Sequence, residues 1–200
     1  MKATITSLIF LLLSLTVSSQ TYKYIGIEEG LSNQKIYKIQ KDARGYMWFL
    51  THVGIDQYNG KEIKHYKLRE GNRELDPLLN INWTFLDKTG TLLVTGKQGR
   101  IFRYDSGHDR FVQIYNMYNY WNKDYHAFVR YSYIDQEDNV WLCGKSAIHL
   151  FNIESGQKQQ ISNRLGNITC IEQINSEHFF IGTDKRIYLA KLENGNLKEL

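Results

Sequence analysis

The chain has 200 residues, of which 42% are hydrophobic and 23% charged, so wholesale disorder is excluded. A single proline and 15 glycines exclude a proline-rich linker and a collagen-like rod, whereas 14 tyrosines and 9 phenylalanines favour strands. The formal charge of +4 is spread along the chain without a basic block, which is too weak to argue for nucleic-acid binding.

The N-terminal segment has the pattern of an export signal. Lys2 precedes an apolar run over residues 5–17, and Ser18 and Ser19 offer the small residues of a cleavage site. The run is shorter than the about 20 apolar residues that a membrane-spanning helix needs. We therefore predict a signal peptide over residues 1–19 and an exported, periplasmic chain over residues 20–200. A retained membrane anchor is the alternative.

The chain then repeats itself, with 45 residues from Asp42 to Asp87 and 48 from Asp87 to Asp135. Each unit carries the pattern Asp-x-x-Gly-x-x-Trp or a variant of it, followed by a small residue before the next apolar run. Unit by unit, these positions are Asp42, Gly45, Trp48 and Gly54; Asp87, Gly90, Leu93 and Gly99; and Asp135, Asp138, Trp141 and Ala147. A fourth, weaker copy has Phe180 at the tryptophan position.

The units alternate apolar and polar residues with period two and are punctuated by turns, which fits strands and not helices. A period of this length is typical of a four-stranded propeller blade. We predict an all-β fold, a β-propeller fragment with strands A to D in each blade and blades near 30–66, 80–115, 128–161 and 168–200. The large residues at the tryptophan position are expected to pack one blade on the next, and ligand stacking by these rings is the alternative.

The first blade also resembles a known family. Gly30-Leu31-Ser32-Asn33 followed by Ile36-Tyr37, and then Asp42-x-x-Gly45-x-x-Trp48, resemble the two-component regulator propeller repeats of periplasmic sensor regions in bacterial hybrid histidine kinases. The resemblance covers roughly residues 22–190 and is weaker in the second and fourth blades, where Leu93 and Phe180 replace tryptophan.

The resemblance implies a particular domain order. It implies seven-bladed propellers, an immunoglobulin-like module, a membrane helix, a kinase and often a DNA-binding regulator. On this basis we expect the chain to be the N-terminal part of a longer protein that is membrane-attached only through later segments and forms a homodimer.

Short enzyme-like matches have the wrong context. Ser32-x-x-Lys35 and Lys88-Thr89-Gly90 have the forms found in serine penicillin-recognising enzymes, but the first enters a strand and the second is a repeat turn. The acidic run over residues 135–138 lacks the ligand pattern of a calcium loop, and the histidines lack metal-ligand spacing. No catalytic residue, metal or cofactor is predicted, and Cys143 and Cys170 are expected to be buried thiols.

A candidate binding face follows from strand parity, because the B–C loops and the D–A connections of a meander lie at one end of the blades. Every B–C loop carries a basic or potentially basic residue, namely His52, Lys97, Lys145, and Lys185 with Arg186. The connection after the second blade adds the aromatic residues Tyr118, Tyr120, Trp121 and Tyr125. Aromatic rings and cations together suit an anionic oligosaccharide. The alternative is that the lysines are merely solvated and the rings pack on their neighbours.

The predicted function is a periplasmic sensory domain of a two-component receptor that detects a carbohydrate and controls a histidine kinase and transcription. One alternative is a secreted protein-interaction scaffold without a kinase. Another is a carbohydrate-active enzyme, which would need a pair of carboxylates about 5 to 10 Å apart. No such pair is identifiable in the sequence.

Overall fold

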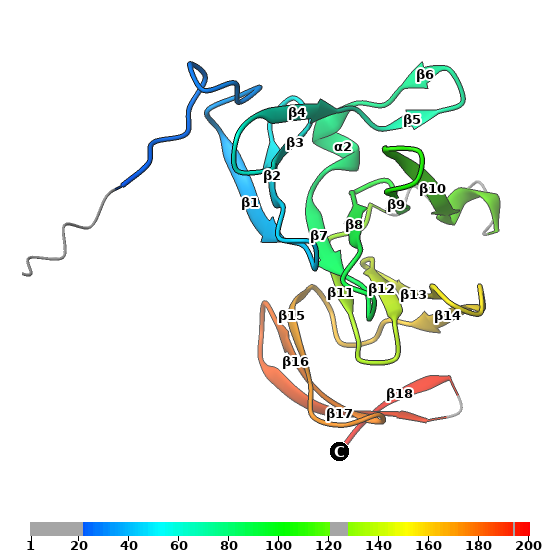
Figure 1. Cartoon of the computed structure of the whole chain (residues 1–200). Coiled ribbons are helices and arrows are strands. Elements are labelled where there is room, and N and C mark those ends of the chain that lie inside the picture. Colours follow the sequence, from blue (N-terminus) through cyan, green and yellow to red (C-terminus); the bar gives the residue numbers. More distant parts are fainter. Residues whose placement is uncertain (1–21, 121–127, 194) are drawn as a thin grey trace, which may run out of the picture.

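The structure is a computed structural model that describes residues 22–120, 128–193 and 195–200. The predicted signal peptide over residues 1–19 lies outside these ranges. The described chain folds into four antiparallel sheets of four strands each, and in every sheet the strands are neighbours in chain order (Figure 1). No helix in the described ranges is long and apolar enough to cross a membrane.

Each sheet is one blade, with strands A to D running outward in chain order. Blade 1 contains β1 (Ile36–Lys41), β2 (Met47–Thr51), β3 (Ile55–Tyr58) and β4 (Ile63–Tyr66). Blade 2 contains β7 (Trp83–Leu86), β8 (Leu92–Thr95), β9 (Arg100–Asp105) and β10 (Arg110–Asn116). Blade 3 contains β11 (Tyr131–Ile134), β12 (Asn139–Cys143), β13 (Ala147–Asn152) and β14 (Lys158–Ser162). Blade 4 contains β15 (Ile168–Gln173), β16 (His178–Thr183), β17 (Ile187–Glu193) and β18 (Asn196–Glu199).

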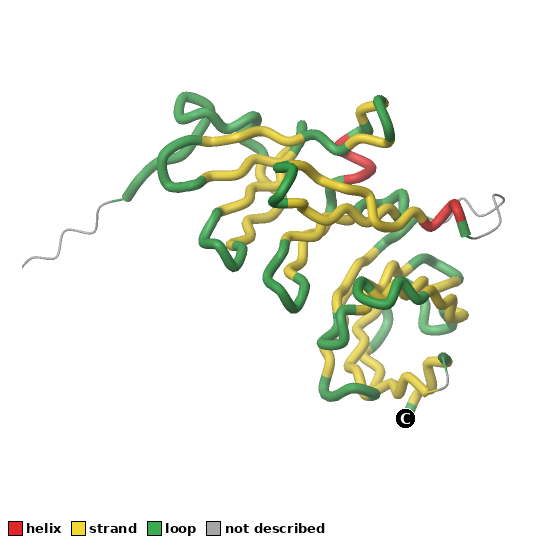
Figure 2. The backbone as a smooth tube through the Cα atoms, turned by 45° about the vertical axis from the view of Figure 1, so that its right-hand side comes forward, coloured by secondary structure: helices red, strands yellow, loops and turns green. Residues whose placement is uncertain are grey.

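The A strands β1, β7, β11 and β15 contact one another in succession, and the D strands lie on the outer side. The blades thus stand side by side along an arc, with blades 1 and 2 above blades 3 and 4 in Figure 2. This arrangement is part of a β-propeller and confirms the predicted all-β fold.

The connection between blades 1 and 2 carries additional structure. A short hairpin of β5 (Arg69–Glu70) and β6 (Arg73–Glu74) is followed by the helical turn α2 (Pro77–Asn80). The Asp76 carboxylate caps α2 by accepting the Leu78 N–H at 2.9 Å. The 3-10 turn η1 (Met117–Asn119) follows β10.

The repeated aspartate is explained by the hydrogen bonds of the A–B turn. In blade 1, Asp42 Oδ1 accepts the N–H groups of Arg44 and Tyr46 at 2.9 and 3.0 Å, while Oδ2 accepts the Trp48 indole N–H at 3.0 Å. Because one carboxylate holds the turn and also reaches strand B, aspartate and tryptophan must be six residues apart. In blade 3, Asp135 makes the same kind of contact to Trp141 at 2.9 Å.

Blade 2 lacks the tryptophan and compensates from the neighbouring strand. The Leu93 side chain has no N–H donor, and Asp87 Oδ2 instead lies 2.6 Å from Arg103 Nη2. Arg103 is the cross-strand partner of Leu93, so its guanidinium reaches the carboxylate from β9. Asp138 replaces the turn glycine in blade 3 and adopts φ 60°, where Gly45 and Gly90 have φ 88° and 73°.

All four large residues at the tryptophan position were predicted to pack against the following blade, and three of them do so. Trp48 packs against Tyr104 and Phe111 of blade 2, with ring centroids 4.8 and 5.6 Å apart. Leu93 lies in the core between blades 2 and 3, and Trp141 in the core between blades 3 and 4. All three are fully buried, whereas Phe180 is 47% exposed because no described blade follows blade 4.

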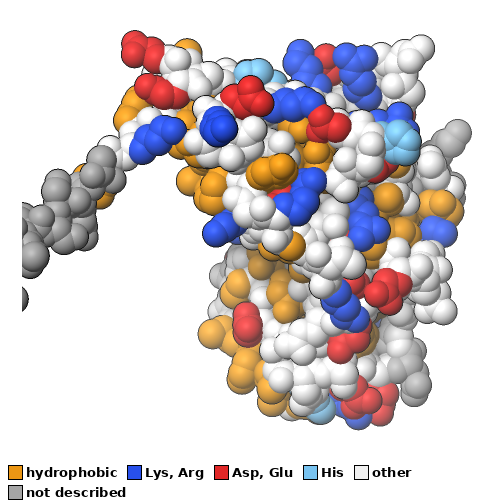
Figure 3. Space-filling model, viewed as in Figure 1, with side chains coloured by type: hydrophobic (Ala, Val, Ile, Leu, Met, Phe, Trp, Pro, Cys, Tyr) orange, Lys and Arg blue, Asp and Glu red, His pale blue; other side chains and the backbone are white. Residues whose placement is uncertain are grey.

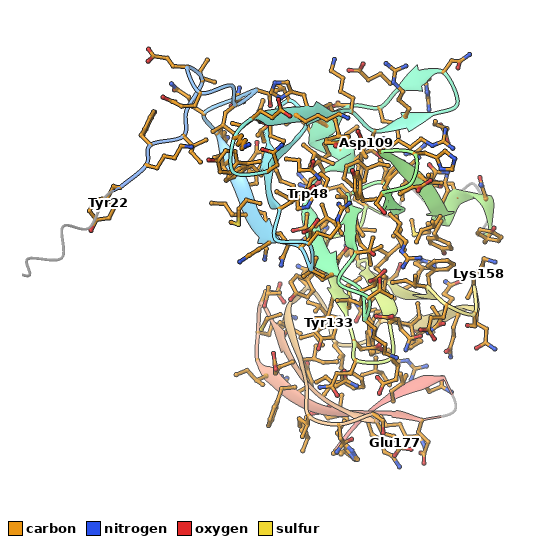
Figure 4. All side chains as sticks on the ribbon, in the orientation of Figure 1. Tyr22, Trp48, Asp109, Tyr133, Lys158 and Glu177 are labelled. Carbon is orange, nitrogen blue, oxygen red and sulfur yellow. The ribbon has the colours of Figure 1, made fainter. Side chains whose placement is uncertain are left out.

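A polar contact adds to the packing of blade 1 on blade 2. Asp109 lies in the C–D turn of blade 2 and accepts the hydroxyl groups of Tyr66 and Tyr104, each at 2.6 Å, close to Trp48 in Figure 4. Lys64 of β4 forms an ion pair with the same carboxylate. Burial raises the pKa of Tyr66 well above its ordinary value, so the hydroxyl donates at any physiological pH.

The expectation for the cysteines is wrong for one of them. Cys143 is buried in β12, and desolvation raises the pKa of its thiol. Cys170 is exposed on β15. It lies on an A strand at the open end of the arc, where no described blade covers it. The local pattern predicted the strand correctly, but it could not show this exposure.

Candidate functional site

Hydrogen bonds between blades place all the A–B turns at one end of the arc. In each of the first three blades, the residue after the repeated aspartate donates its N–H to the next blade. Ala43 donates to the Gly90 carbonyl at 3.2 Å, Lys88 to Asp138 Oδ1 at 3.1 Å, and Gln136 to Gln173 Oε1 at 2.7 Å. Since strands A and B are antiparallel, the B–C loops share the opposite end, which is the candidate binding face.

The predicted basic residues occupy these B–C loops. The side chains of Lys97, Lys145, Lys185 and Arg186 are exposed, and His52 is half-buried. Arg186 lies over the Tyr188 ring, with 5.6 Å between the guanidinium carbon and the ring centroid. The structure thus assigns the predicted cations to one end of neighbouring blades, and their binding of a ligand stays a prediction.

The B–C loops are held by the connections that flank them. Val129 donates its N–H to the Lys97 carbonyl at 2.9 Å, and the Asn163 side chain donates to the Gly144 carbonyl at 2.8 Å. In blade 4, Asp184 donates its N–H to the Asn167 carbonyl at 3.1 Å. The face is therefore built on fixed backbone, which is what a preorganised binding surface requires.

The predicted aromatic residues are only partly placed at this face. Tyr118 is half-buried and packs against the core between blades 2 and 3. Tyr120 is exposed, stacks on Tyr115 with centroids 5.6 Å apart, and carries Lys158 Nζ 4.2 Å from its ring centroid. Lys158 belongs to the outer strand β14 and lies at the outer margin in Figure 4, so Tyr120 lies on the outer side of the blades. Trp121 and Tyr125 lie outside the described residues.

Two residues at this face were missed by the sequence reasoning. Tyr37 on β1 is 45% exposed, and its hydroxyl lies 2.6 Å from His52 Nδ1. Arg130 is exposed and donates its N–H to the Cys143 carbonyl, next to the loop of Lys145. The alternation with Ile36 placed Tyr37 on an A strand, but its contact with His52 joins two segments and leaves no periodic signal in the sequence.

The serine of the Ser-x-x-Lys match, Ser32, has a structural role, because it anchors its segment to blade 1 through hydrogen bonds. Ser32 donates its N–H and its hydroxyl to Asp56 Oδ2 at 2.8 and 2.9 Å, and His65 Nδ1 lies 2.8 Å from Asp56 Oδ1. Asp56 is fully buried between the two. The lysine of the match lies elsewhere, with Lys35 Nζ 5.3 Å from the centroid of the Tyr37 ring. Ser32 therefore fastens the segment before β1 to blade 1.

The acidic run over residues 135–138 is likewise engaged with protein groups. Asp135 caps its turn, and Glu137 Oε2 accepts the Gln173 side chain at 2.8 Å. Desolvation raises the pKa of Asp138, although the Lys88 N–H opposes this by donating to the carboxylate. No cluster of three or more potential metal ligands occurs in the part of the chain that the structure describes.

These observations define the class of protein: a β-propeller fragment with cationic loops at one end. Residues 30–52, which include β1 and β2 of blade 1, match the two-component regulator propeller family. No curated protein matches the chain in sequence.

Solved structures match over most of the chain. The extracellular domain of a protein described as a hybrid two-component system from B. thetaiotaomicron is similar with a TM-score of 0.67 and 18% identity, and the match covers 89% of this chain and 26% of that one. The dihydro-heme d1 dehydrogenase NirN gives a TM-score of 0.61 with 10% identity over 85% of this chain and 38% of that one. At such identities these similarities establish the propeller fold. The chain spans about a quarter of the length of the first.

Proposed function

We propose that this chain is part of the extracytoplasmic sensor domain of a two-component receptor, and that its B–C loop face binds an anionic oligosaccharide. The observation that carries the proposal is the coincidence of a two-component regulator propeller repeat in blade 1 with a fold similar to the extracellular domain of a hybrid two-component system. The repeat and the fold are independent indications of the same class of protein.

The face has the chemistry that an anionic sugar requires. Lys97, Lys145 and Arg186 carry exposed cations on three different blades. Tyr37 and His52 add a ring and a hydrogen-bonding pair on blade 1. Lysine and arginine hold carboxylate or sulfate groups, while aromatic rings stack on the C–H faces of sugar rings.

Binding across blades also provides a route to a signal. A ligand that contacts loops of several blades stabilises one arrangement of those blades over another. It can shift a receptor equilibrium only by the difference between its affinities for the two arrangements. A kinase and a transcriptional response downstream, and dimerisation of the receptor, are part of the proposal.

The first experiment is an immunoblot of the native protein after separation of periplasm from membranes, with an antibody raised against residues 22–200. A membrane band far heavier than 23.6 kDa supports the receptor. A soluble periplasmic band near that mass would show that no kinase is attached, and it favours the secreted scaffold.

The second experiment tests the face directly by calorimetric titration of the full chain with polygalacturonate or heparin. Lys97→Ala with Lys145→Ala should weaken binding by about tenfold or more and reduce its salt dependence. Trp121→Ala should weaken binding with the salt dependence retained. Lys61→Ala is the control, because Lys61 is exposed in a C–D turn at the opposite end. Unchanged affinity in the first two variants rejects this face as the ligand site.

A further inference from the structure

A groove lies between the connection that follows β4 and the outer strand β10 of blade 2. It has a volume of about 480 Å³ and is lined by Lys67, Arg69 and Glu70 on one wall and by Arg110, Val112 and Gln113 on the other. The first wall follows blade 1 and includes β5, and the second is the outer strand of blade 2. The volume is within the range of about 300–1,000 Å³ found for ligand sites.

The wall formed by β10 is a free strand edge. β10 pairs with β9 on one side only and is the outermost strand of its sheet. It has seven residues, compared with four in β4 and five in β14. Its pairing with β9 is regular from Arg110 to Gln113, and the register shifts between Gln113 and Tyr115. The regular stretch of the edge therefore coincides with the groove.

The opposite wall is held in place at one end of the groove. Asn116 at the end of β10 donates to Glu70 Oε1 at 3.4 Å, and Arg100 Nη2 lies 3.5 Å from Glu70 Oε2. β5 pairs with β6 alone within the described ranges. The hairpin thus stands beside β10 without completing its sheet, which leaves the edge from Arg110 to Gln113 accessible.

The charges of the groove are positive and incompletely balanced. Glu70 also contacts Arg73 at 2.6 Å, and Lys67 contacts Glu74 at 2.8 Å. Arg69 and Arg110 are exposed and form no ion pair with any residue in the described ranges. Figure 3 shows Lys and Arg side chains gathered over the β5–β6 hairpin. Two unpaired guanidinium groups on facing walls favour an occupant with carboxylates on alternate residues.

We propose that this groove binds an extended acidic segment of a partner protein, which adds a strand to the edge of β10. The free N–H and C=O groups of the edge supply main-chain hydrogen bonds, and Arg69 and Arg110 select acidic side chains. The edge favours a peptide over an acidic sugar, because the main-chain donors and acceptors of an extended peptide repeat with the same spacing as those of the edge, whereas sugar hydroxyl groups do not. The groove is not lined by Lys97, Lys145, Lys185 or Arg186, so its occupant can be tested without a ligand at those loops.

The test is fluorescence anisotropy of the full chain with a labelled eight-residue peptide of alternating valine and glutamate. Binding should weaken at least tenfold for Arg69→Gln/Arg110→Gln, and a peptide with glutamine in place of glutamate should bind as weakly. The control Lys61→Gln/Arg164→Gln removes the same number of exposed charges elsewhere and should leave the affinity unchanged. Both double variants are first shown to unfold at the same urea concentration as the native chain.

A second peptide separates strand addition from charge attraction alone. N-methylation of alternate peptide bonds along one edge keeps every charge and removes main-chain donors, so binding should fall at least tenfold when the methylated edge faces β10. Equal binding of the methylated and unmethylated peptides overturns the proposal. So does a loss of affinity in the control variant Lys61→Gln/Arg164→Gln as large as the loss in Arg69→Gln/Arg110→Gln. Binding of polygalacturonate in the groove without binding of either peptide also overturns it.

Discussion

The aspartate of the A–B turn organises each of the first three blades. In blade 1, Asp42 is buried and satisfies two backbone N–H groups and the Trp48 indole at once. The sequence pattern located this residue in three blades, because a turn and a buried tryptophan impose fixed spacing. It could not show that Arg103 replaces the indole in blade 2, since that contact joins two strands.

Replacing Trp48 by phenylalanine should therefore cost more than the lost ring volume. The variant leaves Asp42 Oδ2 with only the Arg44 guanidinium at 3.2 Å, so we expect the free energy of unfolding to fall by about 1–3 kcal/mol. Urea unfolding of Trp48→Phe, Asp42→Asn and the double variant measures the coupling between the two side chains. Strictly additive losses would contradict this account of the motif.

His149 makes stability depend on pH. It is buried on β13, and desolvation lowers its pKa to about 4 from 6.5. Between these values the unfolded chain binds the additional proton, so the stability that the neutral imidazole contributes is complete above pH 6.5 and is lost as the pH falls towards 4.

The expected loss is up to about 3 kcal/mol, measured by urea unfolding at pH 7.5 and at pH 4.5. In His149→Gln this part of the pH dependence should disappear. The variant His178→Gln, at a more exposed position, should retain it. An unchanged pH dependence in His149→Gln would show that other groups cause it.

The blades are joined through their A–B turns, and glycine permits the contact between blades 1 and 2. A Cβ on Gly90 would lie 2.3 Å from the Ala43 Cβ of blade 1. Gly156 has nearly the same backbone conformation, φ 69° against 73°, with nothing near its Cβ position. The sequence pattern predicted Gly90 as a turn residue, but only the packed structure shows that this turn contacts blade 1.

This pair provides a matched comparison. Gly156→Ala should lose about 1 kcal/mol from the left-handed backbone alone. Gly90→Ala should lose a further 1–3 kcal/mol, because blade 1 must move away from blade 2. The free energy of unfolding in urea measures both. Equal losses would show that the contact between the turns contributes nothing.

For the whole molecule, the main feature is the uncovered face of blade 4. Phe180 and Leu189 are cross-strand partners, and together with Ile187, which is 75% exposed, they form an apolar surface. In Figure 3 hydrophobic side chains gather on the margin near β15 and β16. Asn175, at the position that donates to the next blade elsewhere, bonds within its own turn to the His178 carbonyl.

An apolar face of this kind should associate when the chain is studied by itself. We expect residues 20–200 to show concentration-dependent self-association in sedimentation velocity. Ile187→Lys should reduce the association and change the free energy of unfolding by less than about 0.5 kcal/mol. Lys145→Glu, an exposed change at the B–C end, is the control and should leave the association unchanged. A chain that stays monomeric at all concentrations would contradict the prediction.

The sequence by itself determined the all-β fold, the blade repeat and the A–B turn motif, because alternation, turn residues and the spacing of aspartate and tryptophan are local properties. It also placed the basic B–C loops at one end, since strand parity follows from chain order. Only the tertiary structure decided that Arg103 balances Asp87, that Tyr120 lies on the outer side, that Cys170 and Phe180 are exposed, and that a basic groove lies between blades 1 and 2. These features depend on which blades are neighbours, and contacts between distant segments leave no periodic signal in the chain.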